Sequence, residues 1–450
     1  MPKVVVVGGG WAGCAASIAA RKTGAEVTLL ERTDSLLGTG LVGGIMRNNG
    51  RYTAAEEAIA MGCGEMFLIA DSVAKHTNVD FPGHAHATLY DVARIEPVVR
   101  RFLEGQGITV LFGKRVTKAE KENARITACV TEGGERIEGD AFVDATGSAG
   151  PQANCTRFGN GCAMCALRCP SFGGRVSFSA LAGISEKMGI SASGRPGSMS
   201  GSCKLLKESL HPRIVEALNS TGVFVTPIPP ELAKKDLSFK ACQQYALDEY
   251  KENVVLLDTG HAKLMAPYFP LSSLRLIPGF EDARFVDPYA GSKGNSIRYM
   301  AIAPRDNALK VEGVDNLFCG GEKAGTLVGH TEAIVTGSLA GRNAALYAQG
   351  EELLKLPPET AIGDMIDVSG REIAAGEGLS RRYTFSGSYY FGRMKERGLY
   401  SSDPGQIHER IKRLGLEGIF GKNRLEGQEL GKGGDKGWLK AKSFTLRWKE

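Results

Sequence analysis

Four of the ten cysteines are concentrated in one short stretch, NCTRFGNGCAMCALRCPSF, at residues 154–172. Cys155 comes first, and Cys162, Cys165 and Cys169 follow with the spacing C-x2-C-x3-C-P. Thiolates at this spacing can hold a metal cluster, form a redox-active disulfide or provide a nucleophile. In a reducing cytosol, clustered thiols are more often metal-binding or redox-active than structural.

The spacing matches the end of the bacterial ferredoxin motif C-x2-C-x2-C-x3-C-P, but Gly159 stands where the first cysteine of that motif would fall. Cys155 would then have to loop back as the fourth ligand. We predict a [4Fe–4S] cluster on Cys155, Cys162, Cys165 and Cys169. A redox pair, a structural zinc site and a single reactive thiol stay open. The other cysteines are isolated and are expected to be small buried apolar residues.

A second chemical signal stands at the N-terminus, in KVVVVGGGWAGCAASIAARKTGAEVTLLER. The run Val4–Val7 predicts a buried parallel strand, and Gly8-x-Gly10-x-x-Gly13 follows it directly. A helix is expected from about Gly13 to Lys22, and a second strand over Val27–Leu30. Glycines at this spacing allow a tight turn, a close approach of pyrophosphate and close helix packing, which predicts a dinucleotide site.

Glu31 ends the second strand, where a carboxylate accepts hydrogen bonds from ribose hydroxyls and repels a 2′-phosphate. FAD or NAD therefore fits better than NADP. Three later segments favour FAD: a glycine-rich loop at 33–50, a strand pair ending in Asp144-Ala145-Thr146-Gly147, and a strand, glycine loop and small-residue helix at 313–345. No second strand–GxGxxG–helix unit follows, so we expect electrons to come from a transient nicotinamide, a partner protein or another centre.

Together these segments resemble the FAD-dependent oxidoreductases of the glutathione-reductase type. Within them the loop LLGTGLVGGIMRNNG is similar to a broad family related to the flavin subunit of heterodisulfide reductase and to flavin-dependent tRNA-modifying enzymes. The resemblance covers about residues 1–150 and 290–350 and implies FAD without naming a substrate. The stretch Arg168-Cys169-Pro170-Ser171 also resembles a Cys-Pro-Ser stretch of a tRNA-modifying enzyme.

The resemblance implies cofactor contacts at residues that match the family's motifs. They are Gly8, Gly10, Gly13, Glu31, Arg32, Gly38, Gly43, Thr146, Gly147, Gly321, Glu322, Gly329, His330 and Thr331. The helix that starts near Gly329 would point its N-terminus at the flavin pyrimidine ring. His330 is either a catalytic group there or a packing residue, and no other catalytic residue is assigned. Lys323 is expected to be a local phosphate or structural contact.

These signals predict an α/β fold, with a Rossmann-type FAD-binding domain, an inserted α+β substrate or cap domain and a small C-terminal helical region. The expected boundaries are 1–150 and 291–350 for the FAD domain, 151–290 for the insertion with the cysteines, and 351–450 for the helical region and a basic tail. Helices are also expected over 211–222 and 236–253, and after Asp403, where Pro404 follows an N-cap residue.

The charge and hydropathy of the chain limit which partners and which location we expect. The net charge of +5 comes largely from residues 421–450, which hold eight Lys/Arg and four acids, so a broad nucleic-acid-binding face is not expected. No signal peptide or membrane span is visible, and we expect a cytoplasmic protein. The sequence thus predicts an FAD-dependent oxidoreductase that acts on a small molecule or a redox partner. The alternative is an FAD-dependent enzyme that modifies RNA such as tRNA with the help of a cysteine, and the use of folate stays open.

Overall fold

A five-stranded parallel sheet forms the centre of the molecule, with strand order β19-β10-β1-β2-β6. Its strands are β1 (Lys3–Val7), β2 (Glu26–Leu30), β6 (Thr109–Leu111), β10 (Ala141–Asp144) and β19 (Leu317–Cys319). The structure, a computed structural model, describes residues 1–147, 171–191, 194–200, 203–233, 237, 243–265, 269–286 and 296–421. Val4–Val7 are all buried, as expected for a central strand covered on both faces.

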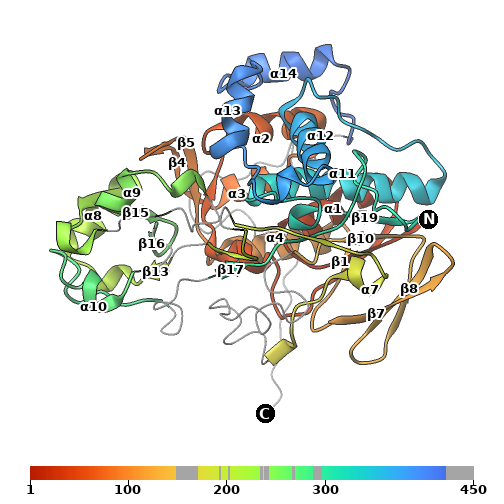
Figure 1. Ribbon diagram of the computed structural model, residues 1–450, viewed down its shortest axis with the longest axis horizontal. Helices are drawn as coiled ribbons and strands as arrows, with labels where there is room; N and C mark the ends of the chain where they lie inside the picture. The colour runs from red at the N-terminus through yellow and green to blue at the C-terminus, as the bar shows by residue number, and fades with distance from the viewer. Residues whose placement is uncertain are drawn as a thin grey trace, which may run out of the picture.

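Two helices pack on this sheet and on each other: α1 (Trp11–Lys22) and α11 (His330–Gln349) (Figure 1). Small residues let them approach closely. A Cβ added to Gly337 would lie 2.2 Å from the carbonyl oxygen of Ala12, and one on Gly341 would lie 2.0 Å from that of Ala16. Neither position accepts a side chain. Helices α3 (Glu65–Ser72) and α4 (Ile95–Gly105) also contact α1.

An antiparallel sheet of β7 (Val116–Glu122), β8 (Arg125–Thr131) and β9 (Arg136–Glu138) stands between β6 and β10 along the chain. The predicted elements around both nucleotide motifs are therefore present. The α/β fold with a parallel central sheet is confirmed.

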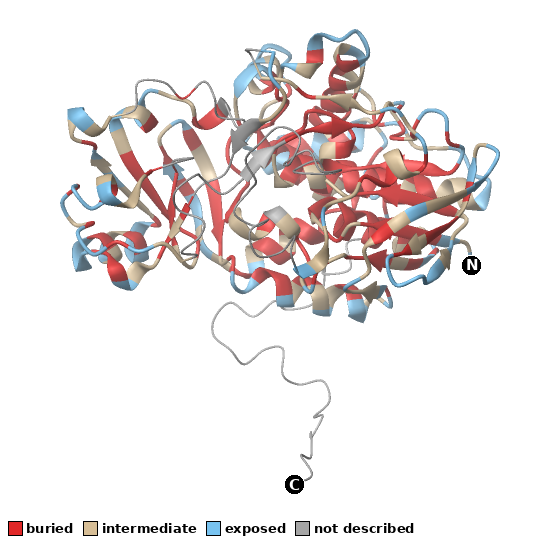
Figure 2. Ribbon diagram, turned by 60° about the horizontal axis from the view of Figure 1, so that its bottom comes forward, coloured by how far each residue is buried: buried red, intermediate tan, exposed pale blue. Residues whose placement is uncertain are grey.

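A second core lies at the other end of the molecule (Figures 1 and 2). Its sheet has the order β13-β16-β15-β14, covered by α8 (Pro212–Thr221) and α10 (Leu271–Leu274). The strands are β13 (Cys203–Leu205), β14 (Val223–Pro227), β15 (Asn253–Asp258) and β16 (Ala262–Leu264). A third sheet, β3 (Ile45–Met46), β4 (Ala74–Phe81) and β5 (His84–Tyr90), packs against it through a shared apolar cluster.

Two short strand pairs join the segment before residue 290 to the segment after it. β11 (Lys187–Met188) pairs with β18 (Ala301–Ile302), and β12 (Ser198–Ser200) pairs with β17 (Ser296–Arg298). Segments from before and after residue 290 thus lie side by side. The division of the chain into domains at fixed residues stays a prediction.

The helices after residue 351 rest on α2 (Gly50–Met61) (Figure 1). They are α12 (Ala361–Ala374), α13 (Ser388–Glu396) and α14 (Pro404–Arg413). The predicted N-cap of α14 is confirmed, because the Asp403 carboxylate accepts hydrogen bonds from the backbone N–H of Gly405 and Gln406. None of the helices in the described ranges is long and apolar enough to cross a bilayer.

The predicted helix over 236–253 is wrong where that stretch is described. Residues 243–245 form a 3-10 turn and α9 spans only Glu249–Glu252. Tertiary contacts override the helical periodicity: the Tyr245 ring packs 4.8 Å from that of His84, and the Tyr250 hydroxyl donates to the carbonyl of Pro82. The remaining elements are short, namely α7 (Phe178–Leu181) and 3-10 turns such as η1 (Gly38–Val42) and η5 (Gly321–Lys323).

Candidate functional site

The candidate site is a cleft along the carboxyl ends of all five parallel strands. Its lining includes Gly8 and Gly10 after β1, Glu31, Arg32 and Thr33 after β2, Lys114 after β6, Thr146 and Gly147 after β10, and Gly321 and Glu322 after β19. In open α/β sheets, ligands bind in this crevice, where the strand order changes direction. Gly38, Gly329 and His330 line the same cleft.

At one end of the cleft, the Glu31 carboxylate is held in place by protein donors. It accepts hydrogen bonds from the backbone N–H of Gly9 (2.9 Å) and from the N–H and hydroxyl of Thr33 (2.8 Å each). An ionised carboxylate has about four acceptor sites, so one can still receive a ribose hydroxyl. This arrangement fits the acid that the sequence predicts beside the adenosine ribose.

The glycine turn has the shape that a pyrophosphate needs. Gly8 has φ +105°, and a Cβ on it would lie 2.5 Å from the Ala145 carbonyl oxygen. A Cβ on Gly10 would meet no atom within 4 Å, so open space faces this residue. No side chain caps the N-terminus of α1, which leaves its first-turn N–H groups to an anion.

Side-chain donors add to this preference for an anion. Arg32, Lys114 and Arg175 all line the cleft. Arg175 Nε and Trp11 Nε1 are buried and have no hydrogen-bond partner among the described residues. Orphaned donors on the wall of a cleft are accounted for when a ligand accepts from them. The glycine turn, the free helix N-terminus and these donors fit FAD, whose pyrophosphate is anionic.

The Thr146 turn is organised by Asp144, which the sequence analysis named in its motif but did not count among the cofactor contacts. One Asp144 oxygen accepts from the Thr146 N–H (3.1 Å) and hydroxyl (2.6 Å). The other accepts from the N–H and hydroxyl of Ser179, both at 2.7 Å. Asp144 therefore fixes the strand end that faces the cleft. Its place at the end of a buried strand was the available signal.

At the far end, the first turn of α11 meets the loop 38–44. His330 stacks on Trp11 with ring centroids 5.4 Å apart, and the Tyr90 hydroxyl lies 3.3 Å from His330 Nδ1. A Cβ on Gly43 would lie 1.8 Å from His330 Cε1, so Gly43 lets the loop pass the imidazole. His330 is thus both a cleft residue and part of a packed aromatic cluster.

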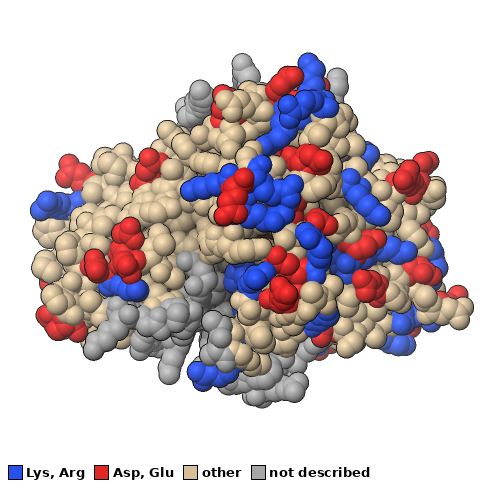
Figure 3. All heavy atoms as spheres, turned by 45° about the horizontal axis from the view of Figure 1, so that its top comes forward, with Lys and Arg blue, Asp and Glu red and all other residues tan. Residues whose placement is uncertain are grey.

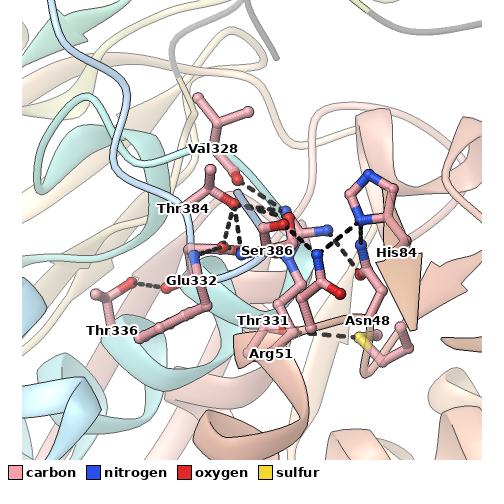
Figure 4. Close-up of polar contacts among 12 residues, drawn as sticks. Asn48, Arg51, His84, Val328, Thr331, Glu332, Thr336, Thr384 and Ser386 are labelled. Atoms are coloured by element: carbon pink, nitrogen blue, oxygen red, sulfur yellow. Dashed lines mark hydrogen bonds and ion pairs between the residues drawn. The ribbon is translucent and has the colours of Figure 1, made fainter. Parts of the chain in front are cut away.

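A buried polar network supports this end of the cleft (Figure 4). Arg51 Nε contacts both carboxylate oxygens of Glu332 at 3.2 Å, and its Nη2 donates to the Val328 carbonyl at 2.9 Å. Glu332 also accepts from the Thr384 hydroxyl at 2.8 Å and from the Phe385 N–H at 2.9 Å. The network joins α2, the start of α11 and the segment before α13.

His84 and two asparagines extend the network towards β5 (Figure 4). Asn49 Oδ1 accepts from the Ala85 N–H, which assigns its Nδ2 as the donor. The amides of Asn48 and Asn49 then donate to His84 Nδ1 at 3.0 and 3.2 Å. His84 Nε2 accordingly carries the proton and donates to the Gln244 carbonyl at 3.1 Å. The loop before α2 is therefore fixed from two sides.

Three predicted contacts lie outside the cleft lining. A Cβ on Gly13 would lie 1.8 Å from the Gly8 carbonyl oxygen, so Gly13 serves close packing of helix and turn. Gly43 faces His330, and the Thr331 hydroxyl donates to the sulfur of Met46 at 3.6 Å. Sequence reasoning missed Trp11, Lys114 and Arg175. Lys114 lies three residues after the end of β6, which was a usable signal, whereas Trp11 is an uncommonly large residue inside a glycine turn.

Lys323 is a structural residue, in agreement with one of the two expectations for it. It is fully buried, donates to the Ser177 hydroxyl (2.7 Å) and the Ala301 carbonyl (2.9 Å), and pairs with Glu186. These contacts tie the glycine loop after β19 to residues 177–186. Glu322 of the glycine loop lines the cleft, and so does Val176, which directly precedes Ser177.

The cysteine cluster Cys155, Cys162, Cys165 and Cys169 lies outside the described residues. Within the described ranges, no group of three or more His, Cys, Asp and Glu side chains could hold a metal ion. The isolated cysteines Cys14, Cys63, Cys129, Cys203 and Cys319 are buried, as predicted, and Cys242 lies outside the described residues. Burial raises the pKa of the Cys319 thiol to about 12, so this thiol is not a nucleophile near neutral pH.

Comparison with known proteins adds a family match. A family described as "Glucose inhibited division protein A" matches residues 3–216 and 269–352. Among solved structures, GidA from Aquifex aeolicus (form II crystal) superposes on 92% of this chain and 73% of its own, with a TM-score of 0.66 and 19% sequence identity. At that identity the superposition shows the fold.

Curated relatives match over shorter stretches. A methylenetetrahydrofolate--tRNA-(uracil-5-)-methyltransferase, TrmFO, of Citrifermentans bemidjiense is 31% identical over 153 residues, 34% of this chain and 30% of the relative. The TrmFO of Brevibacillus brevis is 49% identical over 90 residues, 20% of each chain. The matches thus span a fifth to a third of these relatives. Of the groups that the sequence resembles, they favour the tRNA-modifying flavoproteins, and they do not point specifically to the glutathione-reductase or heterodisulfide-reductase types.

Proposed function

Because this chain belongs to the family described as Glucose inhibited division protein A, we propose that it is an FAD-dependent enzyme that modifies a tRNA. The observation that carries the proposal is the continuous cleft from Glu31 to His330, combined with the family match over residues 3–216 and 269–352. Modification of tRNA therefore replaces a general oxidoreductase, which we expected first, as the leading hypothesis. That expectation becomes the competing hypothesis, because no contact in the described residues identifies a redox partner.

The residues in the cleft would hold FAD in an extended form. Glu31 would receive a ribose hydroxyl, the N-terminus of α1 would face the pyrophosphate, and the first turn of α11 would face the flavin ring. Bound FAD would supply hydride or electron transfer. The chain's own part is to orient the cofactor, to exclude water with the packed cluster at His330, and to place cationic groups at the cleft wall.

One face of the molecule shows no single strongly basic surface for RNA among its described residues (Figure 3). On the face that carries the C-terminal helices, Lys and Arg are interspersed with Asp and Glu (Figure 3). The excess of positive charge lies in residues 421–450, with eight Lys/Arg and four acids. Because each phosphate contact makes binding more sensitive to salt, we propose that this tail contributes to RNA affinity.

The direct test supplies the full-length protein with FAD, a reduced nicotinamide, methylenetetrahydrofolate and an unmodified tRNA transcript. Formation of 5-methyluridine, dependent on folate, supports a reaction like that in the relatives' names. A different modified nucleoside, formed without folate, supports tRNA modification with another carbon source. Turnover of a reduced nicotinamide or ferredoxin with no change in the RNA supports the oxidoreductase instead.

RNA binding is tested separately by changing Lys432, Lys436, Lys440 and Lys442 to Gln in the full chain. The variant should bind tRNA more weakly and show a smaller slope of log affinity against log salt concentration. Replacing Lys118 and Lys395 by Gln gives a control with fewer cations on the described surface. An equal loss in both proteins would contradict a specific role of the tail.

A further inference from the structure

Trp11 places a large aromatic side chain inside the glycine turn. It directly follows Gly10, forms the first residue of α1, and is 4% exposed although it lines the cleft. Its Nε1 is buried and has no hydrogen-bond partner among the described residues. A buried donor without a partner loses its hydrogen bond to water, so its presence calls for an acceptor that the described residues do not provide.

The Trp11 ring is held by an aromatic cluster at the flavin-facing end. It stacks on His330 with 28° between the ring planes and meets Tyr90 edge-on at 5.9 Å. The Tyr90 hydroxyl donates to the Gly40 carbonyl at 3.2 Å. A Cβ on Gly40 would lie 2.1 Å from Trp11 Nε1, so only glycine lets the loop pass the indole. The ring therefore has one well-defined place.

We propose that Trp11 is a positioning residue with two roles in the dinucleotide site. Its ring supports the His330 imidazole at the start of α11, and its N–H donates to an oxygen of the bound dinucleotide between the adenine and flavin rings. The second role rests on the proposed function, since it requires FAD. The first role concerns the protein alone and holds without any ligand.

The chemistry of the cleft explains the choice of acceptor. Trp11 belongs to the first turn of α1, beside Gly10, where the open space and the free N–H groups favour phosphate and hydroxyl oxygens. An indole N–H is only a donor, so it can bind such an oxygen without competing for a proton. A buried aromatic ring is also rigid, which gives the imidazole stacked on it a single orientation.

Two substitutions separate the roles. Trp11→Phe keeps a flat ring and removes the N–H, so FAD affinity of the cofactor-free protein should fall about five- to tenfold, as for one lost hydrogen bond. The side-chain NMR signals of His330 should move little. Trp11→Leu removes the ring as well, so affinity should fall further and the His330 signals should shift more than those of the other six histidines, assigned by His330→Asn.

Tyr347→Phe is the matched control, because Tyr347 lies on the same helix α11, about 25 Å from His330 at 1.5 Å per residue. It should change neither affinity nor His330 signals. An unchanged affinity in Trp11→Phe overturns the donor role, and unmoved His330 signals in a folded Trp11→Leu protein overturn the support role. If the unaltered protein binds no FAD, the proposed function and the donor role fail together, while the His330 signals of the ligand-free protein still decide the support role.

Discussion

The guanidinium of Arg51 and the carboxylate of Glu332 form an ion pair that is almost completely withdrawn from water, with 5% and 0% of their side chains exposed. Arg51 comes from α2, and Glu332 stands in the first turn of α11, two residues after the cleft residue His330. Thr384 and Phe385 also donate to Glu332. The helix end that faces the cleft is thus joined to the C-terminal helical region.

Glu332→Gln should destabilise the protein strongly, because it leaves the buried Arg51 without its counter-charge. Breaking a buried pair by removing one partner typically costs about 3–5 kcal/mol. Urea unfolding followed by circular dichroism measures this loss. Glu138→Gln is the control, since its pair with Arg136 is exposed and such pairs contribute about 0–1 kcal/mol. Equal effects of the two substitutions would contradict the central role of the buried pair.

The double variant Arg51→Met with Glu332→Leu tests the same relationship from the other side. Because it removes both charges, it should cost less than the sum of the single variants. The measured coupling free energy reports how tightly α2 is tied to the start of α11. Additive losses would mean that the two charges act independently.

Gly10→Ala and Gly13→Ala should separate ligand binding from folding. A methyl on Gly10 meets only open space, so the protein should fold normally but lose FAD affinity about tenfold or more, because the methyl occupies the approach of the pyrophosphate. A methyl on Gly13 would collide with the Gly8 carbonyl, so unfolding free energy should fall as well. Thermal unfolding and FAD titration measure the two effects.

Gly105→Ala is the matched control for this pair. Gly105 ends α4, and a methyl there meets no atom within 4 Å. Ala is favoured over Gly in helices by about 1 kcal/mol, so the variant should be slightly stabilised and should bind FAD normally. Normal FAD binding by Gly10→Ala would mean that the dinucleotide does not pass this turn.

Local patterns were sufficient to predict most of the residues that the structure brings together in the cleft. The four-valine strand, the glycine spacing and Glu31 lie within 31 residues, and each of them follows from backbone geometry that a short segment determines by itself. The second cleft wall, from Gly321 to His330, was predicted because its strand, glycine loop and small-residue helix repeat the same geometry. Trp11 was missed because its place depends on Tyr90 and His330, which are distant in the sequence.

The attachment of the C-terminal region could not be predicted in the same way. Glu57 accepts hydrogen bonds from the N–H groups of Ala361 and Ile362 at the start of α12 and from Arg410 of α14, more than 300 residues away. Nothing in the pattern of α2 distinguishes such a buried carboxylate from an exposed one. The failed helix over 236–253 has a similar origin, since the aromatic contacts of Tyr245 and Tyr250 decide its structure.

The four clustered cysteines give a prediction that metal analysis decides. If Cys155, Cys162, Cys165 and Cys169 hold a [4Fe–4S] cluster, anaerobically purified protein should contain about four iron and four sulfide per chain. Cys162→Ala should abolish the bound iron and sulfide. Cys203→Ala should leave them intact because Cys203 is a buried residue of β13. One zinc per chain would indicate a structural site, and two reversibly oxidised thiols without metal a redox pair.

The last prediction concerns acid stability and rests on Asp258, a buried carboxylate at the end of β15. Burial by itself would raise its pKa, but hydrogen bonds from Lys207 (2.6 Å) and His76 (2.9 Å) outweigh burial and lower the pKa below the ordinary 3.8. A carboxyl group whose pKa is depressed in the folded state stabilises the folded protein above the unfolded pKa, and this contribution disappears as the pH falls through the folded pKa.

Lys207→Met should therefore destabilise the protein at pH 5 by about 1.5–3 kcal/mol, and the difference from the unaltered protein should shrink towards pH 3 as Asp258 becomes protonated. Lys251→Met is the control, because its pair with Asp248 is exposed and should contribute little at either pH. Urea unfolding at both pH values measures the differences, and a loss in Lys207→Met that is equally large at pH 3 would show that Lys207 acts through packing and not through the charge of Asp258.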